Sequence, residues 1–73
     1  MRELKVAENI TTLCNKHNMS VVELSEKTGI HRNQIWYYKR GKSEPSIYSA
    51  GRIADVFNMT IDELCFGNLD GKK

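Results

Sequence analysis

Residues 19–46 read MSVVELSEKTGIHRNQIWYYKRGKSEPS, and this stretch decides the fold. Ser20, followed three residues later by Glu23, has the pattern of a capping box, in which a hydroxyl and a carboxylate bond the free backbone N–H groups at the start of a helix. The spacing predicts a short helix over residues 20–28. Gly29 suits the left-handed turn that would end this helix.

A second helix is expected over residues 32–40, and Gly41 suits its end. At about 100° per residue, Ile35 and Tyr38 fall on one side of this helix and should pack inward. The opposite arc carries five large or polar side chains: Arg32, Asn33, Trp36, Tyr37 and Arg40. We therefore expect one of the three consecutive aromatic side chains in the core and the other two outside, beside basic groups.

The exposed aromatic pair requires an explanation, because water solvates large apolar surfaces poorly. In one interpretation, Trp36 covers a neighbouring helix or loop and Tyr37 is half-exposed without any partner. In the other, this face reads DNA, since arginine and asparagine form paired hydrogen bonds with guanine and adenine edges and apolar surface contacts thymine methyl groups. Two short helices joined by a glycine-containing turn, the second with a polar outer face, are typical of a helix-turn-helix motif.

Three further helices and no strand are expected outside this stretch. The first spans residues 2–17, with an apolar stripe of Val6, Ile10, Leu13 and His17. The next spans residues 47–57, with a stripe of Ile47, Ala50, Ala54 and Phe57. Thr60 and Glu63 form a second capping box, which predicts a last helix ending before Gly67. The sequence thus predicts one all-α domain of five helices over residues 1–66 and a frayed tail over residues 67–73.

Composition and charge narrow the classes of protein. The chain has 73 residues, of which 40% are hydrophobic and 27% charged, as in a globular domain. It contains no apolar run long enough to span a bilayer and no secretory signal at its N-terminus. With only two cysteines, a reduced, cytoplasmic setting is the simplest expectation. Residues 31–43 hold four basic and no acidic side chains, whereas residues 55–70 hold four acidic and no basic ones, so one face should attract phosphates.

The chain resembles the phage-repressor type of helix-turn-helix domain, the Cro-like or XRE family. Residues 19–46 match the family's second helix, turn, recognition helix and following loop, and RIADVFNMTIDELC, residues 52–65, matches its last two helices. The resemblance implies a compact five-helix domain of the lambda-repressor-like fold that binds operator DNA as a homodimer on a two-fold-related site. We expect the dimer contact in the C-terminal region, around Leu64, Cys65, Phe66 and Leu69.

The same resemblance assigns roles to individual positions. Four residues of the recognition helix match positions that contact bases: Arg32, Asn33, Trp36 and Tyr37. Positions near the phosphate backbone are Ser20, Arg40, Lys42, Ser43 and Ser46. The family commonly has an acidic residue where this chain has Lys39, paired with a basic residue of the first helix where this chain has Cys14.

Other chemistries fit the sequence less well. The letters GKS at residues 41–43 lack the earlier glycine of a phosphate-binding loop, because position 36 is Trp. The two cysteines and two histidines lack the paired spacings of a zinc site, and no catalytic constellation is identifiable. We expect no enzyme activity, cofactor or small-molecule ligand. The alternatives left open are a protein-interaction module, such as an antitoxin or antirepressor, and a restriction–modification controller protein.

Overall fold

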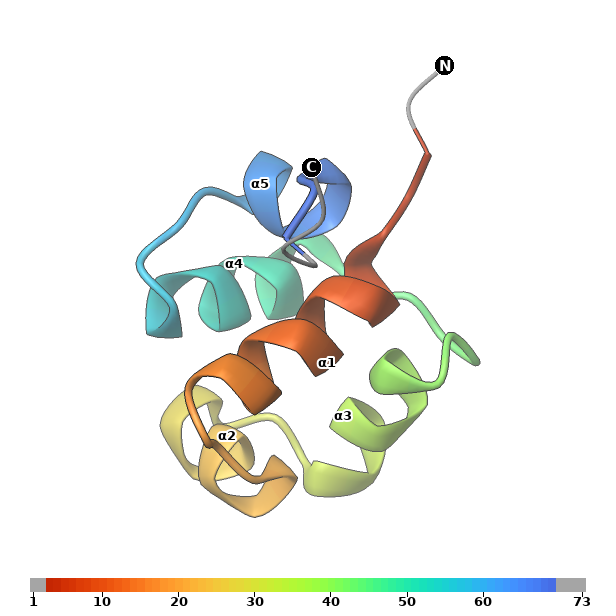
Figure 1. The fold of residues 1–73 in the computed structure, drawn as a ribbon. Coiled ribbons are helices and arrows are strands. Elements are labelled where there is room, and N and C mark those ends of the chain that lie inside the picture. Colours follow the sequence, from red (N-terminus) through yellow and green to blue (C-terminus); the bar gives the residue numbers. More distant parts are fainter. Residues whose placement is uncertain (1–2, 70–73) are drawn as a thin grey trace.

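The computed structural model describes residues 3–69, and within them the chain forms five helices and no strand (Figure 1). The helices are α1 (Val6–Lys16), α2 (Val21–Thr28), α3 (Arg32–Lys39), α4 (Ile47–Val56) and α5 (Ile61–Phe66). This confirms the predicted all-α fold with α2 and α3 as its central helix pair. No helix in the described part is long and apolar enough to cross a membrane.

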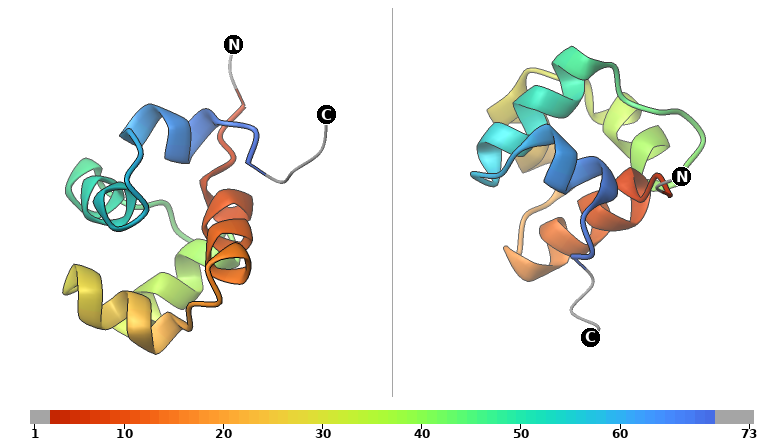
Figure 2. Two further views of the ribbon diagram at one scale, coloured as in Figure 1. Left: turned by 60° about the vertical axis from the view of Figure 1, so that its left-hand side comes forward. Right: turned by 90° about the horizontal axis from the view of Figure 1, so that it is seen from above.

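The main helix contacts form a closed ring. Helix α1 packs against α3, α3 against α2, α2 against α4, α4 against α5, and α5 returns to α1. The views in Figure 2 show α2 and α3 together on one side of the molecule and α5 on the opposite side. Helices α1 and α4 therefore support the α2–α3 pair from behind, and α5 joins α1 to α4 on the far side (Figure 2).

The centre of the core receives one completely buried side chain from each helix. These side chains have no exposed surface: Ile10, Leu24, Ile35, Ile53 and Leu64. Because each helix contributes one of them, the loss of any helix would open the core to water. Burying an aliphatic side chain of this size stabilises the fold by about 1.5–3 kcal/mol.

Polar caps fix where the helices begin. The Ser20 hydroxyl accepts the Glu23 backbone N–H at 3.0 Å, which is one half of the predicted capping box. At Thr60 both halves are present, since the Glu63 carboxylate also accepts the Thr60 backbone N–H at 2.9 Å. At the other end of α2, Gly29 has φ +76°, the left-handed conformation that its position predicts.

The predicted start of the first helix is wrong. Helix α1 begins at Val6, and residues 3–5 of the predicted helix are not helical. The cause is a long-range contact, because the Lys5 backbone N–H donates to the Cys65 carbonyl of α5 at 2.7 Å. Arg2 lies outside the described residues.

The predicted apolar stripes hold except at the ends of their helices. Ile47, expected in the core, is 69% exposed, and Ile53 is the buried isoleucine of α4. His17, at the end of α1, is also exposed, and its ring lies 5.2 Å from that of Phe57. Ile47 lies outside the core, and His17 lies at its edge against Phe57, so helical periodicity alone misplaces both side chains.

The tail predicted over residues 67–73 falls mostly outside the described part of the chain, and its boundary stays a prediction. The structure describes its first three residues. Leu69 packs, partly buried, against the hydrophobic core. The Lys5 ammonium donates to the side-chain oxygen of Asn68 at 3.4 Å, a second contact between the two ends of the chain.

Asn9 joins α1 to the end of α5 from inside the core. Its side chain is 1% exposed, and its Nδ2 donates to the Leu64 carbonyl at 2.8 Å and to the Gly67 carbonyl at 2.9 Å. Carbonyl groups in the last turn of a helix have no partner within the helix, and burial would leave them without water. Asn9 and the Lys5 N–H therefore satisfy the carbonyls that end α5.

Replacement of Asn9 by Ala should destabilise the fold by about 2–3 kcal/mol, because one buried and one partly buried carbonyl group lose their donor. Urea unfolding followed by circular dichroism measures this difference. Asn15→Ala, at an exposed position of the same helix, is the matched control and should stay within about 0.5 kcal/mol of the parent. Equal stability of the two variants would contradict the role given to Asn9.

Candidate nucleic-acid interface

Two buried side chains fix the orientation of α3. Ile35 has no exposed surface and Tyr38 is 4% exposed, so both belong to the core. On the opposite face, Trp36 is 45% and Tyr37 49% exposed. Arg32 and Asn33 are exposed too. The structure therefore confirms which aromatic side chain faces inward and brings the four predicted base-contacting residues onto one solvent-exposed face of α3.

The turn before α3 is held by side chains that bond to backbone. The Thr28 hydroxyl donates to the Leu24 carbonyl at 2.8 Å and accepts the Ile30 N–H at 3.2 Å. The Ser25 hydroxyl donates to the Ile30 carbonyl. From α4, the Arg52 guanidinium donates to the Thr28 carbonyl at 3.4 Å. These bonds fix the angle at which α3 leaves α2.

His31 caps the start of α3. Its Nδ1 accepts the Asn33 backbone N–H at 3.1 Å, in the position that serine or threonine often occupies. The ring is exposed and so remains in contact with solvent at the first turn of α3. Asn33, whose side chain is a predicted base contact, is thus fixed through its own backbone.

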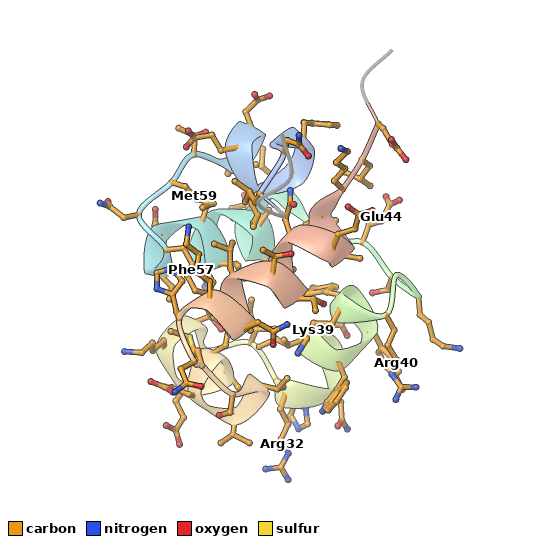
Figure 3. The ribbon with its side chains drawn as sticks, in the orientation of Figure 1. Arg32, Lys39, Arg40, Glu44, Phe57 and Met59 are labelled. Atoms are coloured by element: carbon orange, nitrogen blue, oxygen red, sulfur yellow. The ribbon has the colours of Figure 1, made fainter. Side chains whose placement is uncertain are left out.

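Two cations lie over the Trp36 ring. The Lys39 Nζ is 5.4 Å and the central guanidinium carbon of Arg40 5.3 Å from the ring centroid, within the range of cation–π attraction. In Figure 3, Arg32 and Arg40 point away from the body of the protein, whereas Lys39 lies between α3 and α1. The indole therefore sits in a positive environment and restrains the Arg40 side chain.

Lys39 also acts on the first helix. Burial raises the pKa of the Cys14 thiol, and the nearby Lys39 charge partly opposes this rise. The two positions identified by the resemblance as a substituted pair are therefore close in space. Where the family commonly has an ion pair, this chain has the Lys39 ammonium close to the neutral Cys14 thiol.

The loop between α3 and α4 is attached to α3 at its beginning and in its middle. The Lys42 backbone N–H donates to the Tyr37 carbonyl at 2.9 Å, and Gly41 has φ +73°. In the middle of the loop, the Gln34 Nε2 donates to the Ser43 hydroxyl at 3.0 Å. Lys42 itself is exposed, whereas Ser43 is half-buried.

The remaining predicted phosphate contacts lie at helix starts. Ser20 and Ser46 are the exposed N-caps of α2 and α4, and the Ser46 hydroxyl accepts the Ser49 N–H at 3.2 Å. The Ser46 hydroxyl also donates to the Ser49 hydroxyl at 3.5 Å. The Ser20 cap uses an oxygen lone pair, so the Ser20 hydroxyl can still donate outward. Arg40, the C-cap of α3, is exposed as well.

Sequence reasoning missed two features of this region. Gln34 was given no role, because its partner lies nine residues away and no local pattern connects the two. Tyr48, in the first turn of α4, is 80% exposed. Its position between the polar residues Ser46 and Ser49 is a sequence signal that could have suggested this exposure.

The comparisons with known proteins agree with this geometry. The family model described as "Helix-turn-helix" matches residues 10–64. The chain is similar to an uncharacterised HTH-type transcriptional regulator of Archaeoglobus fulgidus, with 41% identity over 49 residues that cover 67% of this chain and 70% of the relative. It is also 39% identical, over 56 residues, to the SPbeta prophage-derived uncharacterised HTH-type transcriptional regulator YopS of Bacillus subtilis, which covers 75% of this chain and 76% of the relative.

A solved structure shows the same arrangement of helices. The crystal structure of a transcriptional regulator from Listeria innocua superimposes with a TM-score of 0.80 at 28% sequence identity. The match covers 86% of this chain but 59% of that chain, so the present chain spans less than two thirds of the solved regulator. From its five-helix fold, the family match over residues 10–64 and these relatives, the chain belongs to the XRE-type helix-turn-helix family of transcriptional regulators.

Proposed function

We propose that this protein is a sequence-specific DNA-binding regulator of transcription that represses by placing α3 in the major groove of operator DNA. The observation that carries the proposal is the exposed face of α3. Its arginine, asparagine, indole and phenol groups point to solvent while Ile35 and Tyr38 hold the helix from behind. An α-helix fits the major groove, and these side chains match the chemistry of base edges there.

Each of the four side chains has a distinct task in this proposal. Arg32 and Asn33, in the first turn of α3, bond guanine and adenine edges. Trp36 and Tyr37, one turn later, contact thymine methyl groups and the edges of neighbouring bases. The cations beside Trp36 keep this apolar surface in a positive environment, which favours its approach to the polyanion.

Phosphate contacts orient the helix in the groove. We assign them to the exposed side chains of Ser20, Arg40, Lys42 and Ser46 and to the half-buried Ser43. Such contacts set register and affinity but carry no sequence information. The free thiols Cys14 and Cys65 support a cytoplasmic location, where a DNA-binding regulator would act.

The regulator acts as a homodimer in this proposal. Its largest dimension is 31 Å, so two copies fit side by side on half-sites about 34 Å apart. We place the contact in the C-terminal region, where Cys65, Phe66 and Leu69 are half-buried. Leu64 makes no contribution, because the core buries it completely.

A protein-interaction module is the second candidate, and the surface at the start of α4 favours it. Ile47 is 69% and Tyr48 80% exposed, and neither has a task in the DNA-binding proposal. Tyrosine is one of the residues that most often anchor protein interfaces. An antitoxin or an antirepressor would use such a surface to bind a partner protein, whereas a restriction–modification controller would bind DNA through α3.

Substitutions on α3 and in the following loop should affect binding differently. Asn33→Ala should relax base preference at one position of the selected site, at a cost of about 1–3 kcal/mol. Lys42→Ala should weaken binding to all duplexes and reduce the slope of log affinity against log salt by about 1. Binding-site selection and salt titrations measure both effects. The absence of any enriched site, or the same pattern of loss from both variants, would refute sequence-specific reading by α3.

The single tryptophan provides a direct test of where DNA binds. Trp36 is the chain's only Trp, and its exposed indole should be quenched readily by acrylamide, a neutral quencher that leaves ionic strength unchanged. Saturation with duplex DNA should lower the quenching constant several-fold, because the groove covers the indole. A mobility shift with unchanged quenching would place DNA on another surface, and no DNA binding at all would favour the protein-interaction candidate.

Sedimentation analysis tests the dimer and its location. Leu69→Ser should weaken self-association, whereas Tyr48→Ser, a matched apolar-to-polar change on α4, should leave it unchanged. The reverse result would move the interface to the start of α4. A monomer both free and on the selected site would remove the dimer from the proposal.

A further inference from the structure

The side chain of Gln34, in α3, bonds to the loop between α3 and α4. It is half-buried, and its Nε2 donates to the Ser43 Oγ at 3.0 Å across nine residues of sequence. Neighbouring Asn33 has its side chain in solvent. Gln34 therefore connects the helix to the loop rather than adding to the groove-facing surface.

The direction of this hydrogen bond determines what Ser43 can do. An amide nitrogen only donates, so the Ser43 oxygen is the acceptor and its own hydroxyl proton is left over. Among the side-chain hydrogen bonds of residues 3–69, the bond from Gln34 is the one that involves the Ser43 hydroxyl, and in it Ser43 accepts. The Ser43 oxygen thus already accepts one hydrogen bond, while its proton is still free to be donated. The Ser43 hydroxyl is therefore suited to donate to an acceptor outside the chain.

The surroundings of Ser43 favour an anionic acceptor. Lys42 precedes it and is exposed, and the exposed Arg40, the C-cap of α3, lies three residues before it. The exposed carboxylate of Glu44 follows it, so two cations outnumber one anion here. The start of the loop is fixed by the bond from the Lys42 N–H to Tyr37, and its end by the Ser46 cap. The Gln34 bond adds an anchor between these two, so the loop presents Ser43 and Lys42 in a defined geometry.

We propose that Gln34 is a positioning residue for phosphate binding: by occupying the Ser43 lone pair, it directs the Ser43 hydroxyl proton, beside Lys42, toward a backbone phosphate of the DNA. The inference rests on the proposed function and extends it to a residue with no base contact. Gln34 then sets affinity for every duplex and leaves base preference unchanged, in contrast to its neighbour Asn33.

Binding of a random-sequence duplex at low salt, followed by fluorescence anisotropy, tests the coupling. Ser43→Ala should weaken binding by about tenfold, since a hydrogen bond to a charged group is lost. Gln34→Ala should weaken it by several-fold, and the double variant no more than Ser43→Ala alone. Ser43→Thr, which retains the hydroxyl, should restore most of the affinity. If the fold-loss of affinity in the double variant equals the product of the two single losses, the proposal is overturned.

Gln34→Glu separates positioning from simple support of the loop. The carboxylate introduced by this change would accept a hydrogen bond from the Ser43 hydroxyl. The loop then keeps its bond to α3, but the Ser43 hydroxyl can no longer donate to a phosphate. The added charge also repels DNA, and this part is measured by Gln34→Glu in the Ser43→Ala background. The loss from Gln34→Glu should be about tenfold larger with Ser43 present than in the Ser43→Ala background. Equal losses in the two backgrounds would overturn the proposal.

Two controls keep the outcomes distinct. Asn15→Ala, an exposed amide on α1, should change affinity by less than about twofold, as expected for a surface change away from the site. Thermal unfolding of each variant shows that the fold is retained. If the parent protein binds no duplex, the proposed function fails. If it binds and Gln34→Ala has no effect, only the role of Gln34 fails.

Discussion

The fold depends on a hydrogen-bonded junction between its first and last helices. One buried carboxamide, Asn9, satisfies two carbonyl groups at the end of α5, and the Lys5 backbone N–H satisfies a third. Helix α5 has only six residues and would not be stable alone. Its attachment to α1 closes the ring of helix contacts, buries Leu64, and so gives the α2–α3 pair a rigid support.

Because it is supported in this way, α3 has one side in the core and the other in solvent. Ile35 and Tyr38 are held in the core, which leaves the other side of the same eight-residue helix for polar and aromatic side chains. The free side carries no acidic residue. The residues on this side are therefore not constrained by the core, and substitutions there can change the chemistry of the surface at little cost to stability.

Helix starts and the inward face of α3 could be predicted from the sequence, because they depend on residues that are close in the chain. Hydrogen bonds between residues far apart in the chain could not. Ser20 and Thr60 mark helix starts because a hydroxyl at the N-cap accepts a backbone N–H three residues later, a bond between near neighbours in the sequence. The inward position of Tyr38 follows from helical periodicity in the same way. Asn9, by contrast, is a polar residue whose burial makes sense only when α5, 55 residues later, supplies its acceptors. The bond between Gln34 and Ser43 was missed for the same reason. Ile47 was misplaced because periodicity does not show where a core ends.

The hydrogen bonds between the first and last helices also determine when the fold can be completed during translation. The contacts of α2 with α3 join neighbouring segments, which form quickly, whereas those of Asn9 and Lys5 with α5 span nearly the whole chain. During translation, the Asn9 amide has neither of its carbonyl acceptors until the last helix leaves the ribosome. A product cut short before residue 60 would carry every residue of the exposed α3 face but not the partner that completes the core. Only a message translated through α5 then yields a chain in which the core behind α3 is complete.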